Sequence, residues 1–99
     1  MNYGLNDADW QILLTVAIEP LKSVGCDVWI FGSRARGDYR KFSDVDLCYC
    51  CKNPLPGGLL TYIKELLETS NLTIKVDLVN TRDLAADYLP SIDKEKIKL

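Results

Sequence analysis

Apolar residues recur with the period of an α-helix in two stretches of the chain. The first stretch predicts a helix with one buried side, formed by Trp10, Leu13, Leu14, Ala17, Ile18 and Leu21. Asn6 or Asp7 can cap its start, and Gly25 is suited to end it. Pro20 is expected to kink or loosen its last turn. The second stretch, which Asn71 closes, predicts an amphipathic helix with Leu59, Leu60, Ile63, Leu66 and Leu67 on one side.

Three other stretches have the composition or the alternation typical of β-strands. Residues 26–31, rich in Val, Trp, Ile and Phe, predict a short buried strand, and residues 44–51 predict a second one. Residues 73–79 alternate apolar and polar side chains, which indicates a half-buried strand. Gly32 ends the first strand, and Ser33 is placed to cap a short helix that follows it.

The second half of the chain holds the clearest loop and the least regular end. The loop is residues 53–58, rich in Pro and Gly. Thr81 is suited to cap a helical stretch, broken by Pro90, that includes Leu84, Ala85, Tyr88 and Leu89. The Lys-rich residues 93–99 fit either a helix or a frayed end. The order α-β-α-β-α-β-α predicts an α/β (α+β) fold with a small three-stranded sheet, in one domain that spans residues 1–99.

Composition narrows the class of protein. The chain has 99 residues, 47% apolar and 26% charged, which is typical of one small globular domain. It has no histidine, which excludes Ser-His-Asp and Cys-His catalysis and zinc sites that contain histidine. Its apolar stretches are far shorter than the ~20 residues of a membrane span. Residues 1–7 lack the pattern of a signal peptide, so we expect a cytoplasmic protein with no membrane partner.

The charges do not favour a nucleic-acid-binding face. The net charge is −2 and the basic residues form no block, whereas nucleic-acid binders neutralise many phosphates. One small basic cluster is suited to a single phosphate group and consists of Arg34, Arg36, Arg40 and Lys41. Direct binding of nucleic acid is therefore not expected.

The cysteines lack the spacings of zinc or redox sites. There are 4 of them, Cys26, Cys48, Cys50 and Cys51. Because side chains alternate along a strand, Cys48 and Cys50 share one face and Cys51 lies on the other. We expect all of them to be reduced and to pack as small apolar side chains without a part in metal binding.

The segment after the first strand has the features of a phosphate-binding turn. Gly32 lets the backbone bend sharply and lets a phosphate approach closely. Ser33 offers a hydroxyl, and the amides after it lie at a helix N-terminus, which attracts anions. Arg34 and Arg36 are candidates to add positive charge. The segment is not a Walker loop, because the Lys-Ser/Thr pair of that motif is absent.

Aspartates follow the turn at a fixed spacing. Asp44 and Asp46 are two residues apart, so on a strand their carboxylates share a face, about 6.6 Å apart along the backbone. Asp77 lies mid-strand, where carboxylates are disfavoured, and points the same way if its strand neighbours the second. Three convergent carboxylates beside a phosphate-binding turn are suited to one or two Mg²⁺ ions. The alternatives are a solvated strand start for the pair and an exposed, lysine-paired residue for Asp77.

Together these positions resemble a known family. Residues 32–47 read Gly-Ser-Arg-Ala-Arg-Gly-Asp-Tyr-Arg-Lys-Phe-Ser-Asp-Val-Asp-Leu. The Gly-Ser pair, the Asp-Val-Asp triplet and the later strand aspartate resemble the nucleotidyltransferase superfamily that includes DNA polymerase beta. The fuller match resembles its minimal nucleotidyltransferase (MNT) branch. The resemblance spans about residues 7–89 and implies a mixed sheet with helices packed on it.

The resemblance also implies a site and a reaction. Mg²⁺ would lie on the carboxylates of Asp44, Asp46 and Asp77. A nucleoside triphosphate such as ATP would place its phosphates at the turn, on Gly32, Ser33 and Arg34. Asp77 would help to deprotonate the hydroxyl that attacks the nucleotide.

A partner follows from the same resemblance. MNT proteins are similar in lacking the acceptor-binding domain of larger relatives, and many are encoded beside a HEPN-domain protein. In such pairs the HEPN protein is typically a ribonuclease toxin, and the MNT protein is its antitoxin, able to transfer AMP to a tyrosine of the toxin. We therefore expect an Mg²⁺-dependent nucleotidyltransferase that modifies a hydroxyl of a HEPN toxin. Two alternatives remain: an antitoxin that acts by binding alone, and a small-molecule nucleotidyltransferase such as an aminoglycoside-modifying enzyme.

Overall fold

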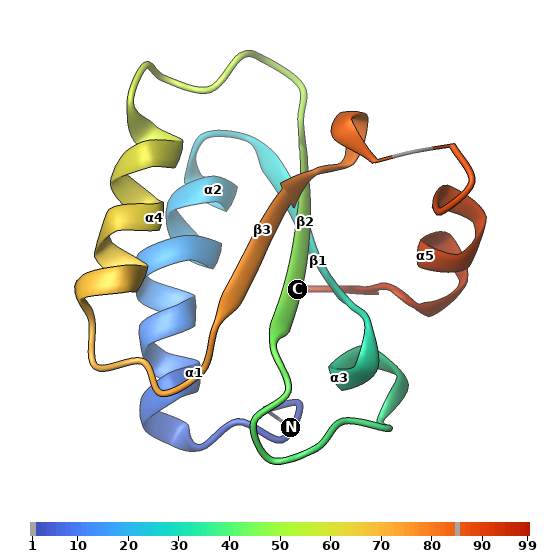
Figure 1. Ribbon diagram of the computed structural model, residues 1–99. Coiled ribbons are helices and arrows are strands. Elements are labelled where there is room, and N and C mark those ends of the chain that lie inside the picture. The colour runs from blue at the N-terminus through green and yellow to red at the C-terminus, as the bar shows by residue number, and fades with distance from the viewer. Residues whose placement is uncertain (1, 85) are drawn as a thin grey trace.

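The computed structural model of the protein describes residues 2–84 and 86–99. In chain order its elements are α1 (Asp7–Leu13), the π-helix η1 (Leu14–Ile18), α2 (Glu19–Ser23), β1 (Cys26–Phe31), α3 (Ser33–Arg36), β2 (Val45–Cys51), α4 (Leu59–Thr69), β3 (Val76–Asn80), the 3₁₀-helix η2 (Thr81–Asp83), α5 (Leu89–Glu95) and β4 (Ile97–Lys98). Figure 1 shows α1, α2 and α4 on one side of a central sheet, and α3 and α5 on the other. The expected α/β class is confirmed. Within the described residues, no helix is long and apolar enough to cross a membrane.

The sheet is mixed, with the strand order β3-β2-β1-β4. Strand β1 is antiparallel to β2 and β4, whereas β3 runs parallel to β2. The expected three-stranded sheet is therefore wrong by one strand, because Ile97–Lys98 from the Lys-rich end pairs with β1. That end was expected to be helical or frayed, and its first residues, 93–95, are indeed helical as the last part of α5 (Leu89–Glu95). A two-residue strand is too short for alternation to indicate it, so only the pairing reveals it.

The hydrophobic core lies between the sheet and the helices α1, α2 and α4. Its fully buried side chains occupy the periodic positions that predicted these elements, among them Leu13, Ile18, Leu21, Val28, Ile30, Val45, Leu47 and Ile63. One carboxylate is buried with them: Asp9 accepts hydrogen bonds from the backbone N–H and from the hydroxyl of Thr73. These bonds satisfy the buried carboxylate and tie α1 to the segment that leads into β3.

The first helical region runs without a break from α1 through η1 to α2. Asn6 caps it as expected, since its side chain accepts a hydrogen bond from the Asp9 N–H at 2.7 Å. The last turn, which Pro20 was expected to kink or loosen, is α-helical through Ser23, and the distortion is instead a π-helical turn at Leu14–Ile18, before the proline. Pro20 lies inside this continuous helical region, and because it has no N–H it cannot donate the next backbone bond of the helix.

One helix and one strand begin at other residues than the sequence predicts. Helix α3 begins at Ser33 itself, and Gly32, at φ 77°, is its N-cap residue without a side-chain hydrogen bond. The expected cap by Ser33 is therefore wrong. The third strand begins at Val76 rather than at residue 73, because Thr73 is engaged by Asp9 before the strand starts.

The C-terminal helix begins where it was expected to be broken. Helix α5 starts at Leu89, with Pro90 in its first turn, where proline is well accommodated. The short 3₁₀-helix before it is capped by Asn80, whose side chain accepts from the Arg82 N–H at 3.0 Å, rather than by Thr81. Ala85, expected in a helix, lies outside the described residues.

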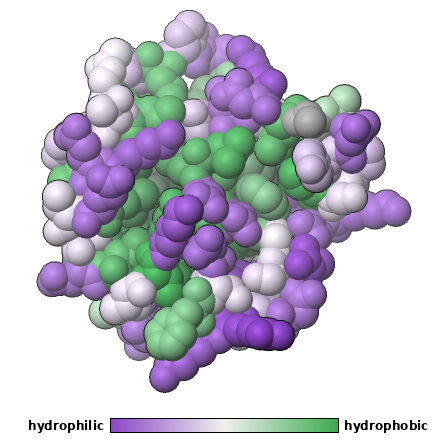
Figure 2. All heavy atoms as spheres, viewed as in Figure 1, coloured by the Kyte–Doolittle hydropathy of each residue, from purple (hydrophilic) through white to green (hydrophobic). Residues whose placement is uncertain are grey.

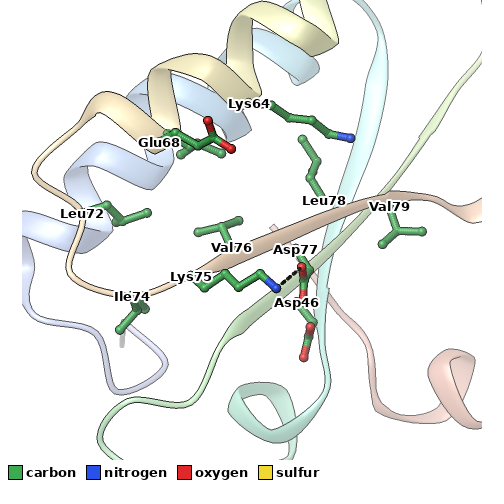
Figure 3. Close-up of a pocket in the computed structure, with 11 residues that line it drawn as sticks. Asp46, Lys64, Glu68, Leu72, Ile74, Lys75, Val76, Asp77, Leu78 and Val79 are labelled. Carbon is green, nitrogen blue, oxygen red and sulfur yellow. Dashed lines mark ion pairs between the residues drawn. The ribbon is translucent and has the colours of Figure 1, made fainter.

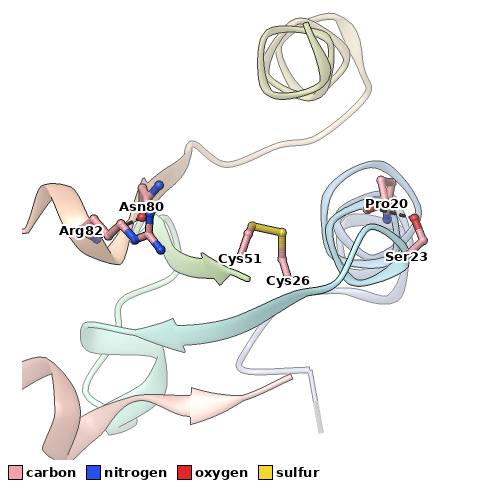
Figure 4. Close-up of a disulfide and its surroundings, with 6 residues drawn as sticks. All are labelled: Pro20, Ser23, Cys26, Cys51, Asn80 and Arg82. Atoms are coloured by element: carbon pink, nitrogen blue, oxygen red, sulfur yellow. Dashed lines mark hydrogen bonds between the residues drawn. A yellow bond between two sulfur atoms is a disulfide. The ribbon is translucent and has the colours of Figure 1, made fainter. Parts of the chain in front are cut away.

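The cysteines are not all free, which corrects the expectation that they are reduced. Cys26 and Cys51 form a disulfide across β1 and β2, with their Cα atoms 4.0 Å apart (Figure 4). The antiparallel register places these two residues directly opposite each other. Cys48 is buried and free, and burial raises the pKa of its thiol. Cys50 is free and half-buried, so Cys48 and Cys50 retain the expected packing role.

Candidate functional site

Two aspartates lie side by side on the face of the sheet away from the core. The parallel register of β2 and β3 pairs Asp46 with Asp77. Both are half-buried, and Figure 3 shows their carboxylates close together. The sequence-based condition for convergence, that the third strand neighbours the second, is met. Asp44, which precedes β2, is exposed at the same end of the strand.

Asp46 on β2 has a strongly shifted pKa. Burial raises the pKa of Asp46 to about 6, helped by the negative charges of Asp77, Asp44 and Glu95, and Arg36 opposes the shift. These three carboxylates are thus close enough to Asp46 to disfavour its charged form. A cation placed among them would relieve that repulsion.

The Gly-Ser turn packs directly against this cluster. Gly32 follows β1 at φ 77° and ψ −159°, a conformation that is essentially restricted to glycine. A Cβ at this position would lie 2.3 Å from Oδ2 of Asp46. Ser33, half-buried, opens helix α3 immediately after it. The turn and the carboxylates, separate in the sequence, therefore form one site.

Arg34 is a structural anchor in this arrangement. Its side chain is buried at 2% exposure and donates to the carbonyl oxygens of Tyr3 at 2.9 Å, Ser43 at 3.0 Å and Lys41 at 3.5 Å. It also stacks on Tyr39, 5.1 Å from the ring centroid. These contacts hold the loop between α3 and β2 against the N-terminal segment and leave the guanidinium engaged with the protein.

Arg36 lies at the surface beside the turn. Its Nη1 is 2.9 Å from Oε2 of Glu95, and its Nε is 3.3 Å from Oδ2 of Asp38. The hydrogen bonds to Glu95 and then Asp38 raise the pKa of Arg36. Glu95 also accepts the Gly32 N–H at 3.0 Å. Sequence reasoning missed Glu95, because nothing in a Lys-rich segment without clear periodicity indicates that it reaches the turn.

A cavity of about 580 Å³ opens beside the aspartates, along the edge strand β3. Asp46 and Asp77 lie at one end, and Lys64 and Glu68 of α4 form the opposite wall (Figure 3). Figure 2 shows hydrophobic side chains among polar ones on this face of the molecule. Nζ of Lys75 is 3.8 Å from Oδ1 of Asp77, but the Lys75 side chain is 71% exposed and the Asp77 side chain 44%, so this ion pair contributes little to stability. The cavity leaves room for a substrate next to the carboxylates.

The residues present fit a metal only in part. Within residues 2–84 and 86–99, no group of three or more His, Cys, Asp or Glu side chains is arranged to hold a metal ion. The adjacent carboxylates of Asp46 and Asp77 do fit Mg²⁺, which is commonly held by one or two carboxylates together with substrate phosphates. The donor set therefore suits an ion that arrives with a nucleotide.

Comparison with known proteins shows the family to which the chain belongs. A family model described as a nucleotidyltransferase domain matches residues 16–99. A protein of Haemophilus influenzae described as a probable protein adenylyltransferase, MntA, is 36% identical over 67 residues, covering 68% of this chain and 59% of that protein. The match thus spans less than two thirds of that relative's length.

Solved structures of low sequence identity share the fold. A toxin–antitoxin complex with AMP-PNP matches at a TM-score of 0.63 and 17% identity, over 89% of this chain and 69% of that chain. A mutant MntA–HpeT toxin–antitoxin complex matches at 0.63 and 16%, over 95% and 72%. A tri-AMPylated Shewanella oneidensis HEPN toxin in complex with its MNT antitoxin matches at 0.59 and 14%, over 95% and 71%. The expected nucleotidyltransferase fold is confirmed.

Proposed function

Because this chain belongs to the nucleotidyltransferase domain family, we propose that it transfers AMP from ATP to a hydroxyl group of a partner protein. The observation that supports this most is the placement of Asp46 and Asp77 side by side, with the Gly32 turn packed against Asp46. A phosphate-binding turn beside paired carboxylates is what phosphoryl chemistry needs, because that chemistry depends on positioning and on charge stabilisation.

Each residue has a defined role in this proposal. Gly32 and Ser33 bind the phosphates through backbone amides and a hydroxyl, and Arg36 adds charge. Asp46 and Asp77, with Asp44 at the strand start, would hold Mg²⁺, which when bound offsets the negative charge of the phosphates. Asp77, which lines the cavity, takes the proton from the acceptor hydroxyl as that hydroxyl attacks the α-phosphate. Pyrophosphate leaves.

Similar proteins indicate the class of acceptor. The similar H. influenzae protein is described as a probable protein adenylyltransferase, and one similar fold is an MNT antitoxin with an AMPylated HEPN toxin. We therefore propose a HEPN toxin as partner, a tyrosine hydroxyl of it as acceptor, and an antitoxin role for this chain. The cavity of about 580 Å³ beside Asp77 offers space for such a side chain.

The test uses ATP labelled at either the α- or the γ-phosphate, with a co-expressed HEPN-domain protein as acceptor. Transfer of the α-label alone, lost in Asp46→Asn, is the expected result. Transfer of the γ-label would indicate a kinase and contradict the proposal. If neither label is transferred and the protein still neutralises the toxin, the antitoxin acts by binding alone. Labelling of an added aminoglycoside but not of the protein would favour the small-molecule enzyme.

A further inference from the structure

Two donors proposed for the nucleotide phosphates are already bound to a carboxylate of the same chain. The N–H of Gly32 donates to Oε1 of Glu95 at 3.0 Å, and Nη1 of Arg36 lies 2.9 Å from Oε2. An oxyanion on a turn amide and a guanidinium is the arrangement that a phosphate oxygen would also adopt. Building on the function proposed above, we propose that Glu95 is an internal competitor of the triphosphate and must release Gly32 and Arg36 before the phosphates bind there.

The negative charge around the turn indicates that Glu95 competes with the triphosphate rather than helping it to bind. Glu95 is bound to the turn that packs against Asp46, so it adds a negative charge to a site that already contains Asp44, Asp46 and Asp77. A triphosphate brings further negative charge to the same place. Like charges this close repel, so a Glu95 that stayed on the turn would oppose the nucleotide. Its departure removes that repulsion and frees both donors.

The segment that carries Glu95 contributes few side chains to the core, which makes release of Glu95 feasible. Ile92 is the buried residue of α5, and it lies outside the main core cluster. Strand β4 has two residues, both exposed, and it pairs with Trp29 and Ile30 of β1. Leu99, which follows it, packs against the core and donates its N–H to the Val28 carbonyl at 2.9 Å, so the end of the chain stays anchored when Glu95 moves. Short exposed elements of this kind open at a small fraction of the global unfolding free energy. Movement of Glu95 therefore leaves the core between the sheet and α4 intact.

The test compares binding by the parent protein, Glu95→Gln and Glu65→Gln. Glu65 is an exposed carboxylate on α4, so its substitution makes the same charge change elsewhere. Dissociation constants for ATP with Mg²⁺ and for tripolyphosphate without metal are measured by calorimetry. We expect Glu95→Gln to bind both ligands more tightly, by roughly fivefold or more, and Glu65→Gln to match the parent. Glu95→Ala, which offers no acceptor to Gly32 or Arg36, should bind at least as tightly, and circular dichroism confirms that each variant is folded.

The outcomes separate this inference from the proposed function. Equal or weaker binding by folded Glu95→Gln, with AMP transfer by the parent intact, would overturn the inference alone and assign Glu95 to supporting the turn. A gain that Glu65→Gln shares equally would overturn it too, because the effect would then be one of general charge. Tighter binding by Glu95→Gln without AMP transfer by any variant would overturn the proposed reaction alone. Absence of ATP and tripolyphosphate binding in all variants would overturn both.

Discussion

Substitution of Gly32 by alanine tests whether the turn is built against Asp46. The position has φ 77°, and an added Cβ would lie 2.3 Å from Oδ2 of Asp46 and 3.2 Å from its Cγ. Gly25 is the matched control: it has φ 88°, yet a Cβ there meets nothing within 4 Å. Both substitutions impose a backbone conformation that alanine disfavours, but only Gly32→Ala also displaces a carboxylate.

The expected costs follow from these geometries. Alanine in a glycine-only backbone region costs about 1–3 kcal/mol of unfolding free energy. Forcing the Asp46 side chain away from its rotamer adds about 0.5–1.5 kcal/mol for Gly32→Ala. Gly25→Ala carries a backbone cost of about 1–2 kcal/mol and no side-chain cost. In a protein of this size, each kcal/mol lowers the Tm by about 4–8 °C.

Urea and thermal unfolding of both variants measure these differences, and a double-mutant cycle isolates the contact. When Asp46 is already alanine, the side-chain part of the Gly32→Ala cost should disappear, which gives a coupling of about 0.5–1.5 kcal/mol. The reasoning would be refuted if Gly32→Ala were no more destabilising than Gly25→Ala and showed no coupling to Asp46.

Three further predictions concern the carboxylates and the cysteines. The folded-state pKa of Asp46, raised to about 6 from 3.8, means that the folded protein binds more protons than the unfolded chain between these values. The contribution of Asp46 to stability is therefore largest at low pH and falls as pH rises through that window, and Asp46→Asn should flatten this part of a urea-titrated pH profile. An unchanged profile would contradict the assigned environment. Mg²⁺ with ATP should raise the Tm more than ATP with EDTA, and equal shifts would argue against a metal at the paired carboxylates. Thiol titration of the denatured, unreduced protein should detect Cys48 and Cys50 only, and reduction should lower stability by about 2–4 kcal/mol; detection of all the cysteines before reduction would contradict the disulfide.

The features that the sequence predicts correctly depend on short continuous segments of the chain. The buried stripe from Leu13 to Leu21 and the strand at residues 26–31 follow from local periodicity and composition. The position of the Gly32 turn beside Asp46 was predictable for a related reason. Gly32 and Asp46 are joined through one short connection, and strand alternation turns Asp46 away from the core side of Val45 and Leu47.

The features that escaped prediction depend on pairing between distant segments. The Cys26–Cys51 disulfide follows from the register of β1 against β2, which composition does not specify. Glu95 reaches the turn only because the chain end folds back along β1. Arg34 has the residue type and position of a phosphate ligand, yet its guanidinium is used by backbone carbonyls, including one 31 positions away. Local sequence patterns do not predict such contacts between distant residues.

The most direct test of the proposed reaction compares Asp77→Asn with Asp27→Asn. Both are strand aspartates about half exposed and paired with a lysine, Lys75 at 3.8 Å and Lys98 at 3.4 Å, but only Asp77 lies beside Asp46. Both variants should fold and bind the partner. With a HEPN partner and α-labelled ATP, Asp77→Asn should reduce the rate of AMP transfer by about 10²–10⁴-fold, the range for a lost general base. Asp27→Asn should transfer at the parental rate. Near-parental transfer by Asp77→Asn, or an equal loss in both variants, would contradict the account.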